Sequence, residues 1–165
     1  MRSSSLRAAL LMCVVCLVGC DHASKIVAAA ALRNAAPVVV VPGLLDLHYT
    51  ENRDVAFDML SRLSLRLPAW AVTGLAVIAT ALVVVAWLRR RAGAWSEQIG
   101  LALVSAGAIG NATDRLLLGH VIDFIHVRLW PVFNVADALV VAGAGLLMLG
   151  VARTASRSDQ LRRGI

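Results

Sequence analysis

Four long apolar stretches dominate the hydrophobic pattern of this chain, at about residues 8–32, 69–88, 98–118 and 132–152. Each is close to the roughly 20 helical residues needed to cross the hydrocarbon core of a bilayer. The second stretch is the clearest, because it carries no charge and has Trp70 and Trp87 near its ends, where interfacial aromatic residues are typical. The pattern predicts an all-α membrane protein with four transmembrane helices, in a single integral membrane domain of residues 1–165.

The longest segment between these stretches, about residues 33–68, has a different pattern. The run Val38–Val41 is β-branched and bounded by proline and glycine, which favours a strand, and Leu45–Tyr49 can pair with it. Further along, Phe57–Leu67 mixes apolar and basic residues at helical spacing, which predicts a short helix in the membrane interface. We therefore expect a small extracytoplasmic cap here, and an unstructured C-terminal tail at 156–165.

Composition agrees with a membrane protein, since 59% of the residues are hydrophobic, 16% are charged and the mean hydropathy is +0.78. Soluble chains have about 45–50% apolar and about 25% charged residues, and disordered chains need low hydrophobicity. The net charge of +6 indicates cytoplasmic loops rather than a nucleic-acid surface, because basic residues gather on one side of a four-span topology. They are Arg2, Arg7, Arg89, Arg90, Arg91, Arg153, Arg157, Arg162 and Arg163. Both termini are therefore expected in the cytoplasm, and no nucleic-acid partner is expected.

The N-terminus permits a second interpretation. Two arginines and an apolar run ending in Leu17–Cys20 are typical of a bacterial lipoprotein signal peptide, with Cys20 as the residue to be lipidated. The apolar run resumes at Ile26–Leu32 and three more spans follow, which is unusual for an anchored lipoprotein. A non-enzymatic lipoprotein stays an alternative, and we expect Cys13, Cys16 and Cys20 to be small residues in a helix core rather than metal ligands or disulfide partners.

Ionisable residues inside or at the edges of the apolar stretches are the strongest functional signal. They are Asp21, Lys25, Asp114, Arg115, Asp123 and Asp137. At a helix centre each costs about 2.5–3.5 kcal/mol, so all of them unpaired would cost roughly 15–20 kcal/mol, more than the net stability of a typical protein. They must pair, lie near an interface or line a wet cavity, and they are candidates for a functional site.

Spacing sorts most of these residues into pairs. Asp21 and Lys25 are four residues apart, so they share a helix face and are expected to form an ion pair. Asp114 and Arg115 are adjacent and point about 100° apart on a helix, so they cannot satisfy each other. Asp114 needs another partner, for which Lys25 is the candidate, and Asn111 shares its helix face.

Two carboxylates, Asp123 and Asp137, are left without an obvious cation. Trp130-Pro131 interrupts the pattern between them, so the fourth helix is expected to begin near Pro131, and the preceding segment can fold back to bring the carboxylates together. Asn134 shares a helix face with Asp137. Carboxylates about 3 Å apart share a proton, so that one activates water while the other protonates a scissile carbonyl, as in aspartic proteases. Buried Asp residues also serve as helix contacts or ion ligands, and these alternatives stay open.

Other chemistries have weaker signals. His120, Asp123 and His126 recur every three residues and could ligate a metal, but the chain has no His-Glu-x-x-His motif, so neither a metal nor a cofactor is expected. The main alternative function is a four-helix membrane carrier that uses the buried Asp residues as a proton or cation path, although the chain lacks the repeat symmetry common in transporters. Small residues along 102–110 predict a helix-packing face.

Four short motifs distinguish this chain from other small membrane proteins. They are Asp21-His22-Ala23-Ser24-Lys25; Asn52-Arg53-Asp54-Val55-Ala56-Phe57; Gly110-Asn111-Ala112-Thr113-Asp114-Arg115 followed by Val121-Ile122-Asp123-Phe124; and Phe133-Asn134-Val135-Ala136-Asp137. In this order they resemble the signal peptidase II family, the lipoprotein signal peptidases of bacterial inner membranes. Each motif alone is weak, but four in order on matching spans are specific.

The resemblance implies a fold of four transmembrane helices with an extracytoplasmic β-cradle and a short interfacial helix. It implies an aspartic endopeptidase that cuts diacylglyceryl-modified prolipoproteins before the lipidated Cys and is inhibited by globomycin. Asp123 and Asp137 would be the catalytic pair. The residues expected to bind substrate or support the pair are Asn52, Asn111, Asp114, Arg115, Asn134, Asp21 and Lys25. The enzyme would be a multi-pass protein of the bacterial inner (cytoplasmic) membrane, in contact with membrane lipids, with its active site near the extracytoplasmic face.

Two features depart from the family's usual pattern. Asp54 occupies a position where the family usually has Gly, so a backbone conformation with positive φ must be adopted by Asp, one of the few other residue types that tolerate it. This departure bears on the shape of the loop and on fine substrate or inhibitor preference, and not on the chemistry. The stretch from Asp123 to Asp137 is shorter than in many members, which would leave the site more open.

Overall fold

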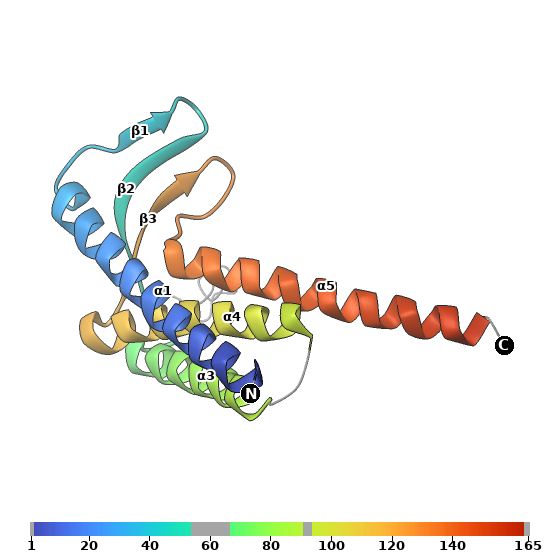
Figure 1. Cartoon of the computed structure of the whole chain (residues 1–165). Coiled ribbons are helices and arrows are strands. Elements are labelled where there is room, and N and C mark those ends of the chain that lie inside the picture. Colours follow the sequence, from blue (N-terminus) through green and yellow to red (C-terminus); the bar gives the residue numbers. More distant parts are fainter. Residues whose placement is uncertain (1, 54–66, 91–93, 164–165) are drawn as a thin grey trace.

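The computed structural model describes residues 2–53, 67–90 and 94–163, which form helices and one three-stranded sheet (Figure 1). In chain order the elements are α1 (Arg2–Leu32), β1 (Val38–Val41), β2 (Leu45–Asn52), α3 (Ala69–Arg89), α4 (Trp95–Leu118), β3 (Val121–Val127) and α5 (Val135–Arg163). Asp54 and nearly all of the expected interfacial helix at Phe57–Leu67 lie outside the described residues. The sheet lies at one end of the helices, beside the end of α1 and the start of α5 (Figure 1).

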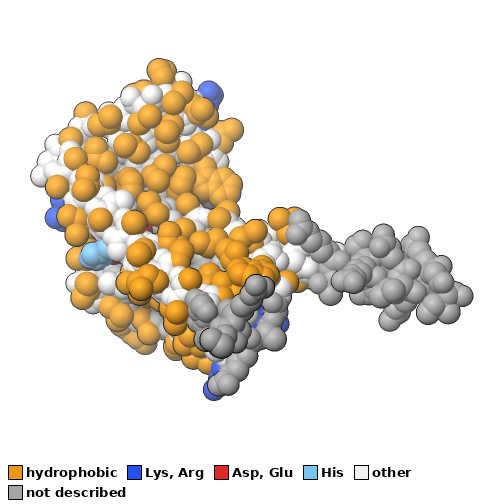
Figure 2. Space-filling model, in the orientation of Figure 1, with side chains coloured by type: hydrophobic (Ala, Val, Ile, Leu, Met, Phe, Trp, Pro, Cys, Tyr) orange, Lys and Arg blue, Asp and Glu red, His pale blue; other side chains and the backbone are white. Residues whose placement is uncertain are grey.

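Three of the helices are long and apolar enough to cross a membrane, which confirms the membrane character predicted from the hydrophobic pattern. These segments are Leu6–Leu32 of α1, Ala69–Arg89 of α3 and Val135–Ala152 of α5. Few of their side chains are buried, and hydrophobic side chains cover most of the face shown in Figure 2. Soluble monomers rarely expose apolar patches larger than a few hundred Å², so this surface fits a lipid environment.

Helix α4 is the central helix, and among the four long helices described it is the one without a segment in this set. It packs against α1, α3 and α5. Small residues allow the closest approaches: a Cβ on Gly107 would lie 2.2 Å from the carbonyl oxygen of Ala136, and a Cβ on Gly143 would lie 2.6 Å from that of Gly100. The predicted packing face of Ala102, Ala106 and Gly110 is also buried, with Ala102 and Ala106 at 4% and 0% exposed, and is therefore confirmed. Shielding by three neighbours explains how α4 can carry polar residues that a lipid-facing helix could not.

The hydrophobic core includes a tryptophan that was expected at the membrane interface. Trp87 is 6% exposed and packs with Val14, Ala102 and Ala106, so its ring is covered by neighbouring helices. Trp70, at the other end of α3, is 79% exposed. Pro68 directly precedes the helix, as its N-cap residue.

The cysteines of α1 also differ from expectation. Cys13, Cys16 and Cys20 are free and exposed rather than part of a helix core. The reason is that α1 uses one narrow stripe for its contacts with the other helices. The buried positions of this stripe recur at helical spacing, at Val14, Asp21, Lys25, Ala28 and Leu32.

Strands β1 and β2 form the predicted hairpin. The N–H of Leu44 donates to the carbonyl oxygen of Val41 at 3.0 Å, and between them Gly43 has a φ of 72°. Pro42 followed by a glycine with positive φ is the sequence of a type II turn. The pairing expected between the valine run and the segment from Leu45 is therefore confirmed.

Strand β3 is an element that was not expected, although its sequence is rich in β-branched residues. It pairs antiparallel with β2, so the strand order is β1-β2-β3. Leu47 pairs with Ile125, and the next pair is Thr50 with Asp123, so β2 has one residue more than β3 between them. This β-bulge reverses the alternation of the side chains that follow it. It places Asn52 on the same face of the sheet as Asp123.

After β3 the chain folds back on itself. The N–H of Trp130 donates to the carbonyl oxygen of Val127 at 2.9 Å, which closes a tight turn. Phe133 and Ile125 then exchange two hydrogen bonds of 2.8 and 2.9 Å. This pairing keeps the chain extended beyond Pro131, so α5 begins later than expected, but the predicted fold-back is present.

The other end of α5 differs from the prediction as well. The backbone is helical to Arg163, where an unstructured tail was expected from residue 156. Residues 153–163 contain neither glycine nor proline, so no residue there interrupts the helix.

Candidate active site

Polar side chains cluster where α1, α4 and α5 meet the sheet. All the residues selected from the sequence for the site come together here: Asp21, Lys25, Asn52, Asn111, Asp114, Arg115, Asp123, Asn134 and Asp137. Two of them, Asp123 of β3 and Asp137 of α5, are called the acidic pair below. The cluster thus joins residues that lie far apart in the chain.

Lys25 is the centre of the ionic part of this cluster. Its Nζ lies 2.8 Å from Oδ2 of Asp21 and 2.9 Å from Oδ2 of Asp114, and it donates to Oδ1 of Asn111 at 3.1 Å. Both pairings predicted for Lys25 are therefore confirmed. Arg115 points elsewhere, as expected for the neighbour of Asp114, and its Nη1 donates to the backbone oxygen of Asn111 at 3.4 Å.

The carboxylates paired with Lys25 also bind the backbone beside the acidic pair. Oδ1 of Asp21 accepts a hydrogen bond of 2.8 Å from the N–H of Ala136, in the first turn of α5, where a negative charge is favourable. Oδ2 of Asp114 accepts one of 3.4 Å from the N–H of Ile122. Ala136 and Ile122 each directly precede a member of the acidic pair. The ion pairs of Lys25 therefore position both carboxylates through the backbone.

Amide groups hold all four oxygens of the acidic pair. Asp123 accepts hydrogen bonds from Nδ2 of Asn134, at 2.6 Å, and Nδ2 of Asn52, at 2.9 Å. Asp137 accepts them from Nδ2 of Asn111, at 2.7 Å, and the backbone N–H of Asn134, at 3.2 Å. Asn134 therefore links the two carboxylates, because its side chain donates to Asp123 and its backbone N–H donates to Asp137.

Asn134 has a second role as the N-cap of α5. Its Oδ1 accepts a hydrogen bond of 3.0 Å from the N–H of Asp137, while the carboxylate of Asp137 accepts one from the N–H of Asn134. This reciprocal arrangement is a capping box. The spacing of an Asn and an acid three residues later was a sequence signal for the true start of this helix. Asn134 also donates to Oδ1 of Asn111 at 3.1 Å, so one side chain links the helix start to both carboxylates.

The environment of Asp123 changes its acidity. Burial raises the pKa of this carboxyl, and the negative charge of Asp137 raises it further, to about 7. Hydrogen bonds from Asn52 and Asn134 act in the opposite direction, because they stabilise the charged form. Near neutral pH the carboxyl exists in both protonation states, which is the condition that general acid catalysis requires.

The metal-binding alternative based on spacing is wrong for its three residues. His120 Nε2 lies 3.8 Å from a carboxylate oxygen of Glu51, and Asp123 is held by asparagines. His126 Nδ1 lies 3.0 Å from Asp46, on the opposite side of the strand. Three-residue spacing predicts a shared face only on a helix, and this segment is a strand.

A cavity of about 520 Å³ opens beside the acidic pair. Its wall is almost entirely apolar, and it includes Val127, Leu129, Trp130, Phe133, Asp137 and Val141. Leu129 has a φ of 69°, which is uncommon for residues other than glycine, and its side chain is 96% exposed at the turn between β3 and α5. Asp137, one member of the acidic pair, thus borders a cavity that suits an apolar chain.

Comparisons with known proteins agree with this geometry. The sequence model of the family described as signal peptidase (SPase) II matches residues 13–153. The lipoprotein signal peptidase of Geobacter metallireducens is 36% identical over 145 residues, which is 85% of this chain and 88% of that protein. That of Xanthomonas euvesicatoria pv. vesicatoria is 40% identical over 147 residues, or 86% and 84% of the two chains.

Solved structures have the same fold. One bacterial membrane enzyme superposes with a TM-score of 0.78 over 91% of both chains at 24% identity, and another with a TM-score of 0.74 at 23% identity, over 87% of this chain and 92% of the other. Since the family's sequence model and the relatives both cover most of its length, this chain belongs to the signal peptidase II family.

Proposed function

We propose that Asp123 and Asp137 are the catalytic carboxylates of a membrane aspartic endopeptidase that removes signal peptides from diacylglyceryl-modified prolipoproteins. Cleavage takes place on the N-terminal side of the lipidated Cys. The observation that carries the assignment is the arrangement of the acidic pair, whose carboxylates come from different elements and have every oxygen oriented by an amide, at the wall of an apolar cavity.

In the first step Asp137 is ionised and Asp123 carries a proton. Asp137 takes a proton from a water molecule as its oxygen attacks the carbonyl carbon before the lipidated Cys, and Asp123 protonates the carbonyl oxygen. The product is a neutral tetrahedral diol. The raised pKa of Asp123 supports its role as the acid.

In the second step the tetrahedral intermediate collapses. Asp137 gives its proton to the leaving nitrogen, the carbon–nitrogen bond breaks, and Asp123 recovers a proton from the hydroxyl group. Asn52, Asn111 and Asn134 act as positioning residues, because their hydrogen bonds keep both carboxylates in place through this exchange. The reaction needs two carboxylates and water.

The apolar cavity is the proposed binding region for the substrate. An apolar segment of the signal peptide lies along Phe133 and Val141 so that the scissile bond reaches Asp137. The lipid chains on the Cys stay in the bilayer and the substrate enters laterally between helices. Globomycin is expected to compete for this region.

We further propose that α4 crosses the membrane together with α1, α3 and α5. With four spans, the basic residues of both ends and of the link between α3 and α4 lie in the cytoplasm, and the sheet and the acidic pair lie near the extracytoplasmic face. The membrane is then the bacterial inner membrane.

The ionic contacts argue against a proton or cation carrier. Asp21 and Asp114 are held by Lys25 and by backbone N–H groups, so both carboxylates are occupied in supporting the acidic pair.

The lipoprotein alternative predicts that the mature chain begins at Cys20. Intact mass measurement is expected to find residues 1–19 still attached, as α1 runs without a break through this position.

Isosteric substitution of the acidic pair tests the proposal. We expect Asp123→Asn and Asp137→Asn each to lower kcat by at least about 10³-fold, because general acid and base catalysis supplies about 10²–10⁴ per group and both are needed. The assay follows a diacylglyceryl-prolipoprotein on a gel, with enzyme in lipid vesicles. EDTA is expected to leave the rate unchanged.

Glu97→Gln is the matched control, because it is the same acid-to-amide change near the other end of α4. Its position is roughly 20 Å along the helix from Asn111, so activity should be retained. Cleavage at the normal rate in either variant of the acidic pair, with the control active, would exclude the catalytic assignment.

A further inference from the structure

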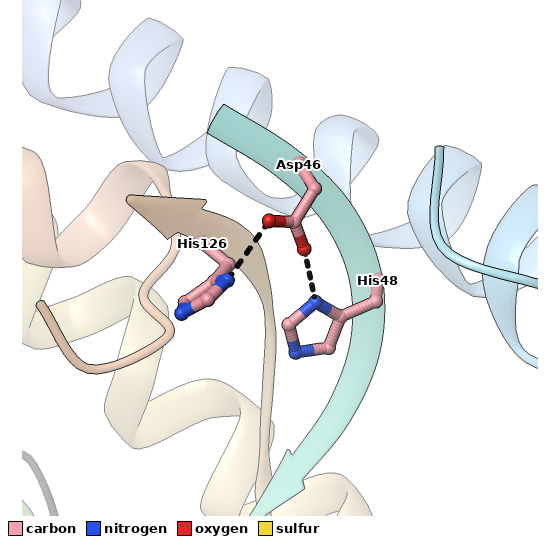
Figure 3. Close-up of side chains that lie close together, drawn as sticks. All are labelled: Asp46, His48 and His126. Carbon is pink, nitrogen blue, oxygen red and sulfur yellow. Dashed lines mark hydrogen bonds and ion pairs between the residues drawn. The ribbon is translucent and has the colours of Figure 1, made fainter. Parts of the chain in front are cut away.

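A second polar cluster lies on the other face of the sheet, and the acidic pair does not involve it. Asp46 and His48 of β2 and His126 of β3 point toward one another (Figure 3). Because side chains alternate along a strand, His126 and Asp123 face opposite sides of β3. All three side chains are partly exposed, at 28–37%, so water and small ions reach them.

The strand register explains why these three side chains meet. Asp46 and His126 are directly opposed in the antiparallel pair, and His48 follows two residues later on the same face, before the bulge has reversed the alternation. The three ligands therefore come from two neighbouring strands that are already hydrogen-bonded. Little conformational entropy has to be lost to bring them together.

The side-chain atoms of Asp46, His48 and His126 that could bind a metal ion lie close together. Nδ1 of His48 lies 3.0 Å from Oδ2 of Asp46, and Nδ1 of His126 lies 3.0 Å from Oδ1. The two imidazole rings are 5.2 Å apart at an angle of 65°, so they do not stack and both nitrogens stay accessible. One ligand atom from each residue lies within 4.8 Å of the others.

We propose that Asp46, His48 and His126 bind a divalent transition-metal ion of the Zn²⁺ class. Two imidazoles and a carboxylate suit this class, whereas Ca²⁺ and Mg²⁺ prefer oxygen ligands only. Tetrahedral zinc has bonds of about 2.0–2.2 Å to nitrogen and oxygen, which places its ligand atoms roughly 3.3 Å apart. The two nitrogen–oxygen distances of 3.0 Å are close to this value, and binding draws together the three ligand atoms, which lie within 4.8 Å of one another. Each imidazole keeps its proton on Nε2 and presents the Nδ1 lone pair, and water occupies the fourth position.

The ion cross-links β2 to β3. These strands carry Asn52 and Asp123 at their other ends, so the ion stabilises the sheet that supports the acidic pair while remaining outside the reaction. None of the three ligands is hydrogen-bonded to the acidic pair, and failure of this proposal would leave the protease assignment intact.

Zinc titration of the full chain tests the site. The protein is purified in detergent without a histidine tag, treated with EDTA and freed of chelator, and ZnCl₂ binding is measured by calorimetry. We expect saturable binding of one ion per chain and a higher Tm. His48→Ala, His126→Ala and Asp46→Asn should each weaken binding by at least about tenfold, the lower limit seen even for indirect partners of metal ligands.

His22→Ala and His120→Ala are the controls, because they remove the other two histidines of the chain and should leave Zn²⁺ affinity unchanged. Co²⁺ provides a spectroscopic check, since a nitrogen and oxygen site gives no thiolate charge-transfer band. Such a band would place the ion at the cysteines of α1 and overturn the proposal. Unchanged affinity in the His48→Ala/His126→Ala double variant, or no saturable binding of Zn²⁺, would overturn it equally.

Discussion

Asparagine side chains determine how the acidic pair is held. Asn52, Asn111 and Asn134 donate to the two carboxylates, and Lys25 is occupied by other acids of the cluster. An amide orients a carboxylate without adding a positive charge, so a buried carboxyl can keep a raised pKa and remain ready to donate a proton. A lysine in direct contact would have lowered the pKa of the same group.

Asn134 both positions the acidic pair and caps α5, and two substitutions at this residue can distinguish these roles. Asn134→Ser keeps a cap for α5 but is too short to donate to Asp123, whereas Asn134→Ala loses both functions. We expect kcat to fall at least about 10²-fold in both variants, as for the loss of a fixed hydrogen-bond donor. Only the alanine variant should also lose about 1 kcal/mol of stability. Turnover and Tm measured on both proteins decide this, and equal activity in the serine variant and the wild type would contradict it.

The pKa of Asp123 makes stability depend on pH. Folding raises this pKa from 3.8 to about 7, so the folded chain binds the proton more tightly than the unfolded chain. The resulting stabilisation is complete below pH 3.8 and is lost as the pH rises to about 7, with an upper limit of about 4 kcal/mol. Asp123→Asn cannot ionise, so its Tm should fall less than that of the wild type between pH 5 and 8. Thermal unfolding in detergent at constant ionic strength measures this, and parallel curves would refute it.

At the scale of elements, the register of β2 against β3 decides whether the sheet supports the site. The bulge between Leu47 and Thr50 lets Asp46 face outward and Asn52 face Asp123 on the same strand. The fold-back after β3 and the capping box of α5 then bring Asp137 to the same place. The bulge, the fold-back and the capping box each set the direction of a side chain through the backbone conformation of a few residues.

Deletion of Glu51 tests the strand register that orients Asn52. With Thr50 still opposite Asp123, Asn52 moves opposite Ile122 and turns to the other face of the sheet. We expect kcat to fall at least about 10²-fold. Deletion of Tyr49 is the matched control, because it removes the extra residue of the bulge and leaves Asn52 opposite Val121, so it should remain active. Normal turnover in the Glu51 deletion variant would show that the face of Asn52 does not matter.

At the scale of the whole molecule, the buried polar groups of the helices gather around α4, and the outer surfaces of the helices are apolar. Asn111, Asp114 and Arg115 lie on α4, which is covered by α1, α3 and α5. The surrounding helices expose hydrophobic side chains instead (Figure 2). A central helix of this kind can carry polar residues, which is why hydropathy identifies three spans more readily than four.

The location of the C-terminus distinguishes three spans from four. With four, both termini lie in the cytoplasm, so green fluorescent protein fused after Ile165 should fluoresce and alkaline phosphatase fused there should be inactive. Phosphatase inserted after Gly43, in the β1–β2 turn, should be active. An active phosphatase at Ile165 would mean that α4 does not cross the membrane.

The sequence by itself determined the apolar helices, the β1–β2 hairpin, the ion pairs of Lys25 and most of the candidate site residues, while Asn52 was selected by the family resemblance alone. These follow from local information, because hydropathy, turn residues and i, i+4 spacing act within a few residues, and buried charges must find partners wherever they lie. The unexpected strand β3 and the capping box at Asn134 also had local signals, in β-branched residues and in Asn-x-x-Asp spacing.

Only the tertiary structure decided how these residues meet. The orientation of Asn52 depends on strand register, the exposure of the cysteines depends on which stripe of α1 contacts α4, and the burial of Trp87 depends on the helices around it. The asparagine contacts of the acidic pair and the Asp46, His48 and His126 cluster join strands and helices that are distant in the chain. Such contacts are set by packing between elements, whose geometry is not encoded in the pattern of any one segment.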